Sequence, residues 1–158
     1  MNLDSSIWKE LQRLETEGLR RHAHPAPATG GVLHVDGRRV LNFSSNDYLD
    51  LARDPSVLAA ARLALSDYGA GATASRLVTG TLPVHEQLEQ RLATHKGYPA
   101  ALLFGSGYLA NAGAITGLVG RGDTIYADRL SHASIIDAAA LSRARLRRFR
   151  HNDPEHLE

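Results

Sequence analysis

Residues 99–149 alternate short apolar runs with segments of helical pattern, and this alternation restricts the possible folds more than any other feature. Three runs are expected to form strands: residues 100–104, 124–127 and 145–149. The first is wholly apolar, which is typical of strands covered on both faces of a sheet. Gly105-Ser106-Gly107 should open one intervening helix, and Ser131 should cap a second that ends near Leu141. This β-α-β-α-β order predicts an α/β fold with parallel strands joined by helices.

Three helices are expected before this alternation begins. Ser5-Ser6 precedes apolar residues at helical spacing and is suited to cap an N-terminal helix. Asp54-Pro55 offers a cap and a proline at the first position of a second helix, which should end at Gly69. Pro83 should open a third helix that stops at Gly97.

A hairpin is expected between the first two of these helices. Residues 32–35 and 40–43 flank Asp36-Gly37, a dipeptide that suits a type I′ turn. Residues 24–27 with Gly30-Gly31 should form a linker before this hairpin, because proline and glycine interrupt regular structure. The N-terminal helix and the hairpin together predict a distinct segment, residues 1–45, followed by a larger domain from residue 46 to residue 158.

Composition excludes several classes of protein. The chain has 158 residues and no cysteine, so disulfides, iron–sulfur clusters and a thiol nucleophile are excluded. A net charge of +1 argues against a nucleic-acid binder. Five arginines lie between Arg143 and Arg150, and their side chains are expected to cover the edge of a strand or helix. Apolar runs are too short to cross a membrane, and no metal-binding spacing of histidines is present. A cytoplasmic protein is expected.

The turn Gly105-Ser106-Gly107-Tyr108 is the first candidate site. A helix that begins at the carboxyl end of a strand presents free N–H groups to a phosphate, and glycine lets the backbone come close. A tight turn without a ligand explains these residues equally well. A third interpretation is a dinucleotide site, because the sequence fits G-x-G-x-x-A and Asp128 follows at the distance typical of a ribose-binding acid.

His132 is the second candidate. It follows the strand 124–127 at a helix start, so it should lie in the crevice at the strand ends. There it could stack on an aromatic cofactor or transfer protons near neutral pH, although capping the helix would also account for it. Ser131-His132 does not form a hydrolase site, because neighbouring residues at a helix start do not face each other.

Five ordered motifs resemble those of the α-oxoamine synthases, a family of fold-type I pyridoxal-phosphate enzymes. These motifs are residues 42–49 (NFSSNDYL), 75–81 (SRLVTGT), 102–108 (LLFGSGY), 128–134 (DRLSHAS) and 148–153 (RFRHND). The family condenses an amino acid with an acyl thioester and releases carbon dioxide. Members are more than twice this length, and Asp153-Pro154-Glu155 has the pattern of a helix start, so a continuation beyond Glu158 is expected.

The resemblance implies a role for each candidate residue in binding pyridoxal phosphate. Ser106 and the N–H groups of Gly107 and Tyr108 would hold the cofactor phosphate, and Tyr108 would also line the site. His132 would stack on the pyridine ring, contact the substrate and act as a catalytic residue. Residues 46–158 would then be the first part of a large cofactor domain, with a mainly parallel sheet and helices on both faces.

The same resemblance implies substrate contacts. Arg20 matches an arginine that binds the far carboxylate of the acyl chain, although an ordinary exposed arginine explains it equally well. Asn46 corresponds to an asparagine near the amino-acid carboxylate, and Ser75 to a position near the thioester. The motifs most resemble the member that joins L-alanine to a pimeloyl thioester in biotin synthesis. Glycine C-acetyltransferase and 5-aminolevulinate synthase are the alternatives, and an NAD-binding domain or a noncatalytic fragment ranks below them.

Several departures from the family pattern stand out. Asp50 and Ala74 occupy positions where glycine is usual, which matters if either needs a positive φ. The only lysines, Lys9 and Lys96, lie outside the family's lysine motif, so the Schiff-base lysine is expected beyond Glu158. These residues alone are therefore expected to be inactive. The resemblance also implies a homodimer, with the loop 69–81 near the second chain.

Overall fold

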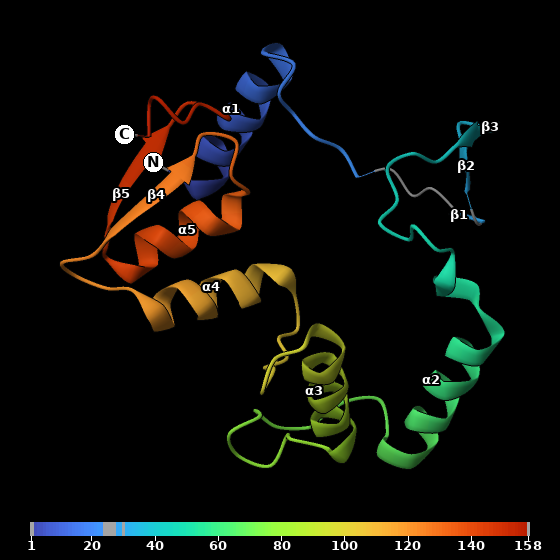
Figure 1. The fold of residues 1–158 in the computed structure, drawn as a ribbon. Coiled ribbons are helices and arrows are strands. Elements are labelled where there is room, and N and C mark those ends of the chain that lie inside the picture. The colour runs from blue at the N-terminus through green and yellow to red at the C-terminus, as the bar shows by residue number, and fades with distance from the viewer. Residues whose placement is uncertain (1, 24–27, 30, 158) are drawn as a thin grey trace. The chain divides into compact units, whose positions relative to one another are not determined.

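A computed structural model describes residues 2–23, 28–29 and 31–157. The chain forms two compact units, Met1–Asp67 and Tyr68–Glu158 (Figure 1). The linker expected at residues 24–27 and Gly30 lies outside the described residues. The expected division between residues 45 and 46 concerns the complete protein, and it stays a prediction.

The first unit begins with the expected helix, α1 (Leu3–Thr16). Its cap is Asn2, whose side chain accepts the N–H of Asp4, so the prediction of a Ser5-Ser6 cap was wrong. Both serine hydroxyls instead donate to backbone carbonyls three residues earlier, because these residues already lie inside the first turn.

An antiparallel sheet follows α1 in the order β1 (Ala28–Thr29), β2 (Val32–Val35) and β3 (Arg38–Leu41). The turn between β2 and β3 has Asp36 at φ 49° and Gly37 at φ 74°. Two positive φ angles are what a type I′ turn requires, so the predicted hairpin is confirmed. β3 ends at Leu41, two residues before its predicted end.

A short helix η1 (Leu51–Arg53) leads into α2 (Pro55–Tyr68). Asp50 precedes η1 with φ 53°, which is a conformation that aspartate tolerates better than most residues, and it therefore replaces the usual glycine. The Asp54 carboxylate accepts the N–H groups of Ser56 and Val57, as predicted for the cap of α2. Gly69 ends this helix with φ 79°.

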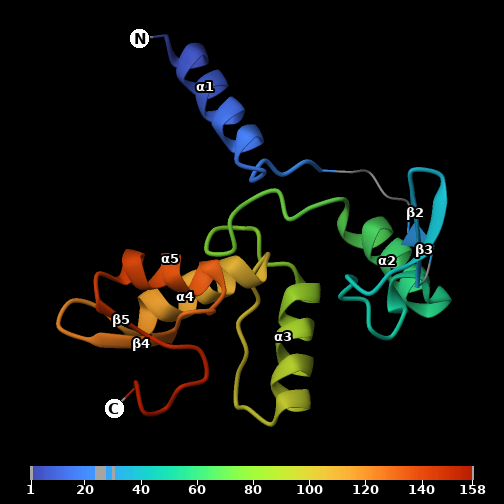
Figure 2. The ribbon, with the colours of Figure 1, turned by 90° about the horizontal axis from the view of Figure 1, so that it is seen from above.

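The second unit holds α3 (Pro83–Lys96), α4 (Gly107–Leu118), β4 (Thr124–Asp128), α5 (Ala133–Ser142) and β5 (Arg145–Phe149). β4 and β5 are parallel and joined through α5, as the sequence predicts. Figures 1 and 2 both show α4 and α5 side by side. The buried side chains here are small, Ala127, Ala138 and Ala139 among them, which lets the helices and strands approach closely.

Residues 100–104 do not form the predicted strand. Among the described residues they have no regular secondary structure and no strand pairs with them, and Leu102 is 71% exposed. An apolar run predicts burial, but it does not predict which strand would pair with it. This segment instead contacts α3 and α4. The N–H of Leu103 donates to Glu89 on α3 at 2.8 Å. Phe104 packs so closely on α4 that a Cβ at Gly113 would lie 2.6 Å from its ring.

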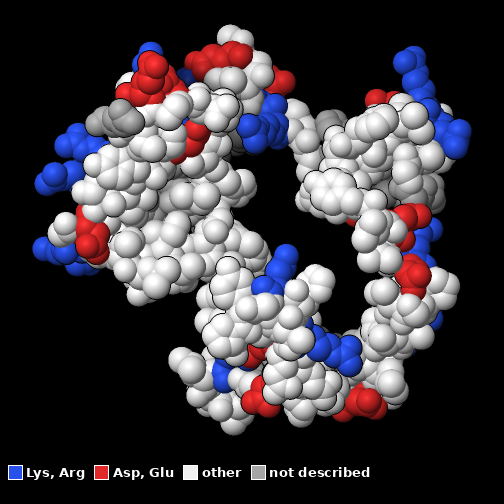
Figure 3. All heavy atoms as spheres, in the orientation of Figure 1, with Lys and Arg blue, Asp and Glu red and all other residues white. Residues whose placement is uncertain are grey.

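The arginine-rich segment 143–150 is largely the strand β5 and its two flanks. All five of its arginines are exposed, and blue atoms gather at the β4–β5 side of the second unit in Figure 3. Arg148 donates to the carbonyl of Arg129, and Arg150 pairs with Asp153 at 2.9 Å.

No helix in the described residues is long and apolar enough to cross a membrane.

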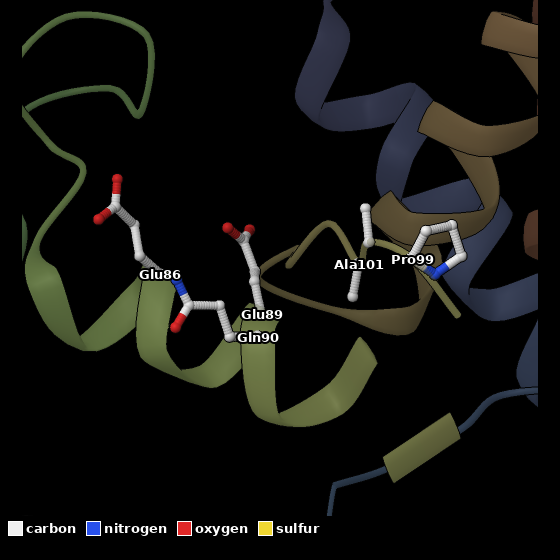
Figure 4. A pocket seen from close by; sticks show the side chains of 6 residues that line it. Glu86, Glu89, Gln90, Pro99 and Ala101 are labelled. Atoms are coloured by element: carbon white, nitrogen blue, oxygen red, sulfur yellow. The ribbon is translucent and has the colours of Figure 1, made fainter. Parts of the chain in front are cut away.

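Glu89 connects three parts of the second unit. Its carboxylate accepts the N–H of Leu103 and pairs with Arg76 of the loop 69–81 at 3.1 Å. Figure 4 shows Glu86, Glu89 and Gln90 on α3 at one side of a hollow of about 370 Å³, with Pro99 and Ala101 at the other. The Leu103 N–H, and then Arg76, hold the pKa of Glu89 below its ordinary value.

We expect Glu89→Gln to lower the urea midpoint of unfolding at pH 7. A carboxyl group whose pKa falls on folding stabilises the protein above its ordinary pKa, and this contribution is lost as pH falls further. The gap between the two proteins should therefore narrow as pH drops below about 4.5. Glu86→Gln, which alters the same hollow, is the control. A gap that does not depend on pH would contradict this role of Glu89.

Candidate active site at the start of two helices

The start of α4 has two backbone N–H groups without an internal acceptor. Ser106 caps the helix, and its hydroxyl accepts the N–H of Leu109 at 3.2 Å. The N–H of Ala110 donates to the Ser106 carbonyl. Among the described residues this leaves the N–H groups of Gly107 and Tyr108 free, with open space where a Cβ of Gly107 would stand. These two groups are the donors that the predicted phosphate site requires, and the binding of a phosphate there stays a prediction.

Tyr108 bridges the two helices. Its hydroxyl donates to Asp137 on α5 at 2.9 Å, and its side chain is 45% exposed. Asp137 accepts this bond and carries a negative charge, so the pKa of Tyr108 is raised above 10.0. The bridge joins the first turn of α4 to the second turn of α5.

His132 is the cap of α5, where the sequence predicted Ser131. Its Nδ1 accepts the N–H of Ser134 at 3.2 Å and lies 2.7 Å from the Ser134 hydroxyl. Ser131 lies one residue too early: its N–H closes a turn onto the Asp128 carbonyl at 3.0 Å, and the helix begins with the bond from the Ile135 N–H to the His132 carbonyl. In Figures 1 and 2 α4 and α5 begin at the same end of the pair.

Asp128 at the end of β4 does not act as a free acceptor. Its carboxylate accepts the N–H of Leu130 at 2.7 Å and that of Asn152 at 3.0 Å, and it pairs with His151 at 3.1 Å. These bonds, led by the one from Leu130, hold the pKa of Asp128 below its ordinary value. A ribose would have to displace them, which disfavours the dinucleotide interpretation.

Ser75 lies in a tightly folded loop of the second unit. Its carbonyl accepts the N–H groups of Val78 and Gly80, and a Cβ at Gly80 would lie 1.9 Å from the Ala74 carbonyl oxygen. The positive φ in this loop falls at Thr73, with 58°, so Ala74 is not strained. Ala74 and Arg76 line a hollow of about 270 Å³ together with Gly105, which places the neighbours of Ser75 beside the start of α4.

Arg20 and Asn46 belong to the first unit. Arg20 pairs with Glu15 at 3.0 Å just after α1. Asn46 accepts a long bond of 3.4 Å from the Tyr48 hydroxyl, beside a hollow of about 420 Å³ lined by Asn42, Ser45, Asp47 and other residues of that loop. Their predicted contacts with substrate stay predictions.

Three polar residues at this site were missed by sequence analysis: Asn111, Ser134 and Asp137. Asn111 donates to the buried Ser134 hydroxyl at 2.8 Å and so joins α4 to α5. The available signal was the presence of polar residues in two mostly apolar helices, close in sequence to a candidate residue. No group of three or more metal-ligating residues is present among the described residues.

We expect Asp137→Asn to lower the pKa of Tyr108, because the negative charge that opposes ionisation is removed. The hydrogen bond stabilises the protein below pH 10 and is lost as pH rises through the higher pKa of the folded protein. Ultraviolet titration measures this, with Tyr108→Phe identifying the contribution of this tyrosine among the five. An unchanged titration curve in Asp137→Asn would contradict the bridge.

The sequence of this chain is similar to those of known proteins over most of its length. The family model for class I and II aminotransferases matches residues 38–158. An 8-amino-7-oxononanoate synthase of Anaeromyxobacter sp. (strain K) is 56% identical over 152 residues, which are 96% of this chain and 38% of that protein. One from Methylobacterium sp. (strain 4-46) is 50% identical over 159 residues, covering 100% of this chain and 42% of that protein.

Solved structures agree with the sequence relatives. A variant of serine palmitoyltransferase from S. paucimobilis with a bound pyridoxal-phosphate–myriocin aldimine has a TM-score of 0.83 and 32% identity, covering 99% of this chain and 41% of that one. The 8-amino-7-oxononanoate synthase of Francisella tularensis has a TM-score of 0.62 and 34% identity, covering 73% of this chain and 32% of that one. The predicted fold class is confirmed. The chain spans about two fifths of the length of the curated relatives described above.

Proposed function

Because this chain belongs to the class I and II aminotransferase family, we propose that it carries the phosphate and ring contacts of a pyridoxal-phosphate enzyme. The complete protein would condense L-alanine with a pimeloyl thioester of coenzyme A or acyl-carrier protein. The products would be 8-amino-7-oxononanoate, carbon dioxide and the free thiol, as a step of biotin biosynthesis. The relatives at 50–56% identity carry that enzyme's name, which is the main reason to prefer this member of the family.

The start of α4 is the observation that supports a phosphate most directly. The free N–H groups of Gly107 and Tyr108 point along the helix axis, where the positive end of the helix dipole adds to their attraction for an anion. The Ser106 hydroxyl accepts from Leu109, so its own hydrogen stays available to donate. Three donors at one helix start suit the three terminal oxygens of a phosphate group.

His132 would contact the cofactor ring. When bound, pyridoxal phosphate supplies an electron sink for the negative charge that forms when the amino acid loses carbon dioxide. The His132 imidazole is exposed at the start of α5, where its cap bond fixes the ring against the backbone. A fixed ring can stack on a flat cofactor and exclude water from that face without the entropic cost of immobilisation.

The substrate contacts are assigned by resemblance. Arg20 would pair with the far carboxylate of the pimeloyl chain, for which it would exchange its present partner Glu15. Asn46 would lie near the amino-acid carboxylate, and Ser75 near the thioester. Glycine C-acetyltransferase and 5-aminolevulinate synthase remain the alternatives, and the turnover of glycine in place of alanine distinguishes them.

The Schiff-base lysine would come from outside the described site. Lys9 lies on α1 and Lys96 ends α3, and neither is at the start of α4 or α5. We therefore propose that residues 1–158 alone do not catalyse the condensation. Release of free thiol from alanine and pimeloyl-coenzyme A by these residues alone would contradict the assignment.

We expect Gly107→Pro to weaken pyridoxal-phosphate binding to the complete protein by about 10- to 100-fold. Proline fits the first position of a helix but has no N–H, so one charge-assisted bond to phosphate is lost. Gly107→Ala adds a Cβ and keeps the N–H, so the difference between the two variants reports that donor alone. Titration followed by cofactor absorbance gives the affinities. Equal affinities, or saturable binding of NAD instead, would overturn the phosphate assignment.

A homodimer is proposed for the complete protein. The loop 69–81 is the segment expected near the second copy, and two of its apolar side chains are exposed, Leu77 at 100% and Val78 at 74%. Exposed apolar side chains of this size in a tightly folded loop favour contact with another protein surface.

We expect Leu77→Asp to shift the complete protein from dimer toward monomer in light scattering, because a buried unpaired carboxylate is costly at an interface. Leu118→Asp is the control, since Leu118 is 83% exposed at the end of α4 and away from this loop. Residues 1–158 alone should associate or aggregate, because β4 and β5 leave unpaired strand edges. A dimer that is unaffected by Leu77→Asp would remove this loop from the interface.

A further inference from the structure

We propose that Ser134 and Asn111 are positioning residues that hold His132 with its ring proton on Nε2. Neither residue needs to contact cofactor or substrate for this role. The chemical use of the Nε2–H rests on the proposed function, whereas the position of the proton follows from the hydrogen bonds of the chain itself.

The backbone favours one of the two neutral forms of the His132 ring. The N–H of Ser134 can only donate, and it donates to His132 Nδ1 at 3.2 Å. Nδ1 is the acceptor of this bond, which favours the form with the single proton on Nε2. Among the described residues, Nε2 has no hydrogen-bond partner, which leaves its N–H available to an external group.

The Ser134 hydroxyl reinforces this arrangement. Its oxygen lies 2.7 Å from His132 Nδ1 and is completely buried. Because Nδ1 has no proton, the hydroxyl is the donor of this bond. A second donor to Nδ1 disfavours the alternative tautomer. In that tautomer the Nδ1 proton would point at the Ser134 N–H and the Ser134 hydroxyl hydrogen, which are both donors.

Asn111 sets the direction of the serine hydroxyl. Its amide Nδ2 donates to the Ser134 oxygen at 2.8 Å, so the hydroxyl accepts on that side and must direct its own hydrogen elsewhere. His132 Nδ1 is the acceptor within reach. The chain Asn111 to Ser134 to His132 thus runs in one direction, from α4 through a buried hydroxyl to the ring.

This arrangement gives His132 a defined chemical role under the proposed function. A ring held in this way presents a hydrogen-bond donor, and not a base, to an oxygen of the cofactor or the substrate carboxylate. It also keeps one ring orientation, because two bonds hold the same nitrogen. A histidine free to change tautomer would offer the donor only part of the time.

Asn111→Asp is the sharpest test, because it keeps the size of the side chain and replaces the amide group that donates to Ser134 by a carboxylate that can only accept. A carboxylate at this position accepts the Ser134 hydroxyl hydrogen and takes it away from His132. Ser134→Ala removes the hydroxyl altogether. Ser142→Ala is the matched control, since Ser142 is the other buried serine of α5 and bonds only near the end of that helix.

The measurement is ¹⁵N NMR of the histidine rings in the complete protein without cofactor, at a pH where the ring is neutral. His132→Gln identifies the resonances. We expect Nε2 of the unsubstituted protein at the position of a fully protonated nitrogen. In Asn111→Asp and Ser134→Ala it should move part of the way toward the position of an unprotonated nitrogen, because only the Ser134 N–H still favours an acceptor at Nδ1. In Ser142→Ala it should not move.

A kinetic measurement separates this inference from the proposed function. In the loaded enzyme, both substitutions should lower kcat by about fivefold to tenfold, the effect of one hydrogen bond. If the NMR shift occurs but the protein binds no pyridoxal phosphate, the positioning role stands and the proposed function fails. If Nε2 does not move in Asn111→Asp, the inference is wrong, whether or not Ser134→Ala folds.

Discussion

The contact between α4 and α5 determines where the chemistry of the second unit is placed. Small buried residues such as Ala138 and Ala139 let these elements pack closely, and two polar links fix their relative position. Tyr108 reaches Asp137, and Asn111 reaches Ser134. Both helices begin at the same end of the pair in Figures 1 and 2. This contact therefore sets how the starts of α4 and α5 lie relative to each other.

Elements with a local signal could be predicted from the sequence. Asp36-Gly37 encodes its own turn, and Asp54-Pro55 encodes its own helix start, because the deciding hydrogen bonds lie within a few residues. The helix start at Ser106 belongs to the same group. Residues 100–104 failed as a strand because a strand depends on a neighbour, and an apolar run carries no information about which segment that is. Here Glu89 supplied the acceptor for Leu103.

The candidate site divides in the same way. Ser106, Gly107, Tyr108 and His132 could be proposed from the sequence because each stands next to a turn or a helix start. Asn111, Ser134 and Asp137 were missed because their roles depend on a contact between two helices, which periodicity does not reveal. Asp128 shows the reverse error in the dinucleotide interpretation. Its spacing fitted a ribose acceptor, but residues 20 and more positions away occupy its oxygens.

The start of α5 shows why a poorer cap residue replaces a better one. Serine is a favoured cap and histidine is not, so propensity alone selects Ser131. The structure departs from this preference: the N–H of Ser131 closes the turn after β4 onto the Asp128 carbonyl, and the helix begins with the bond from the Ile135 N–H to the His132 carbonyl. Capping then ties Nδ1 of His132 to the backbone and leaves Nε2 for other contacts. Helix capping and a contact with a bound group are therefore compatible roles for one ring, because each uses a different nitrogen.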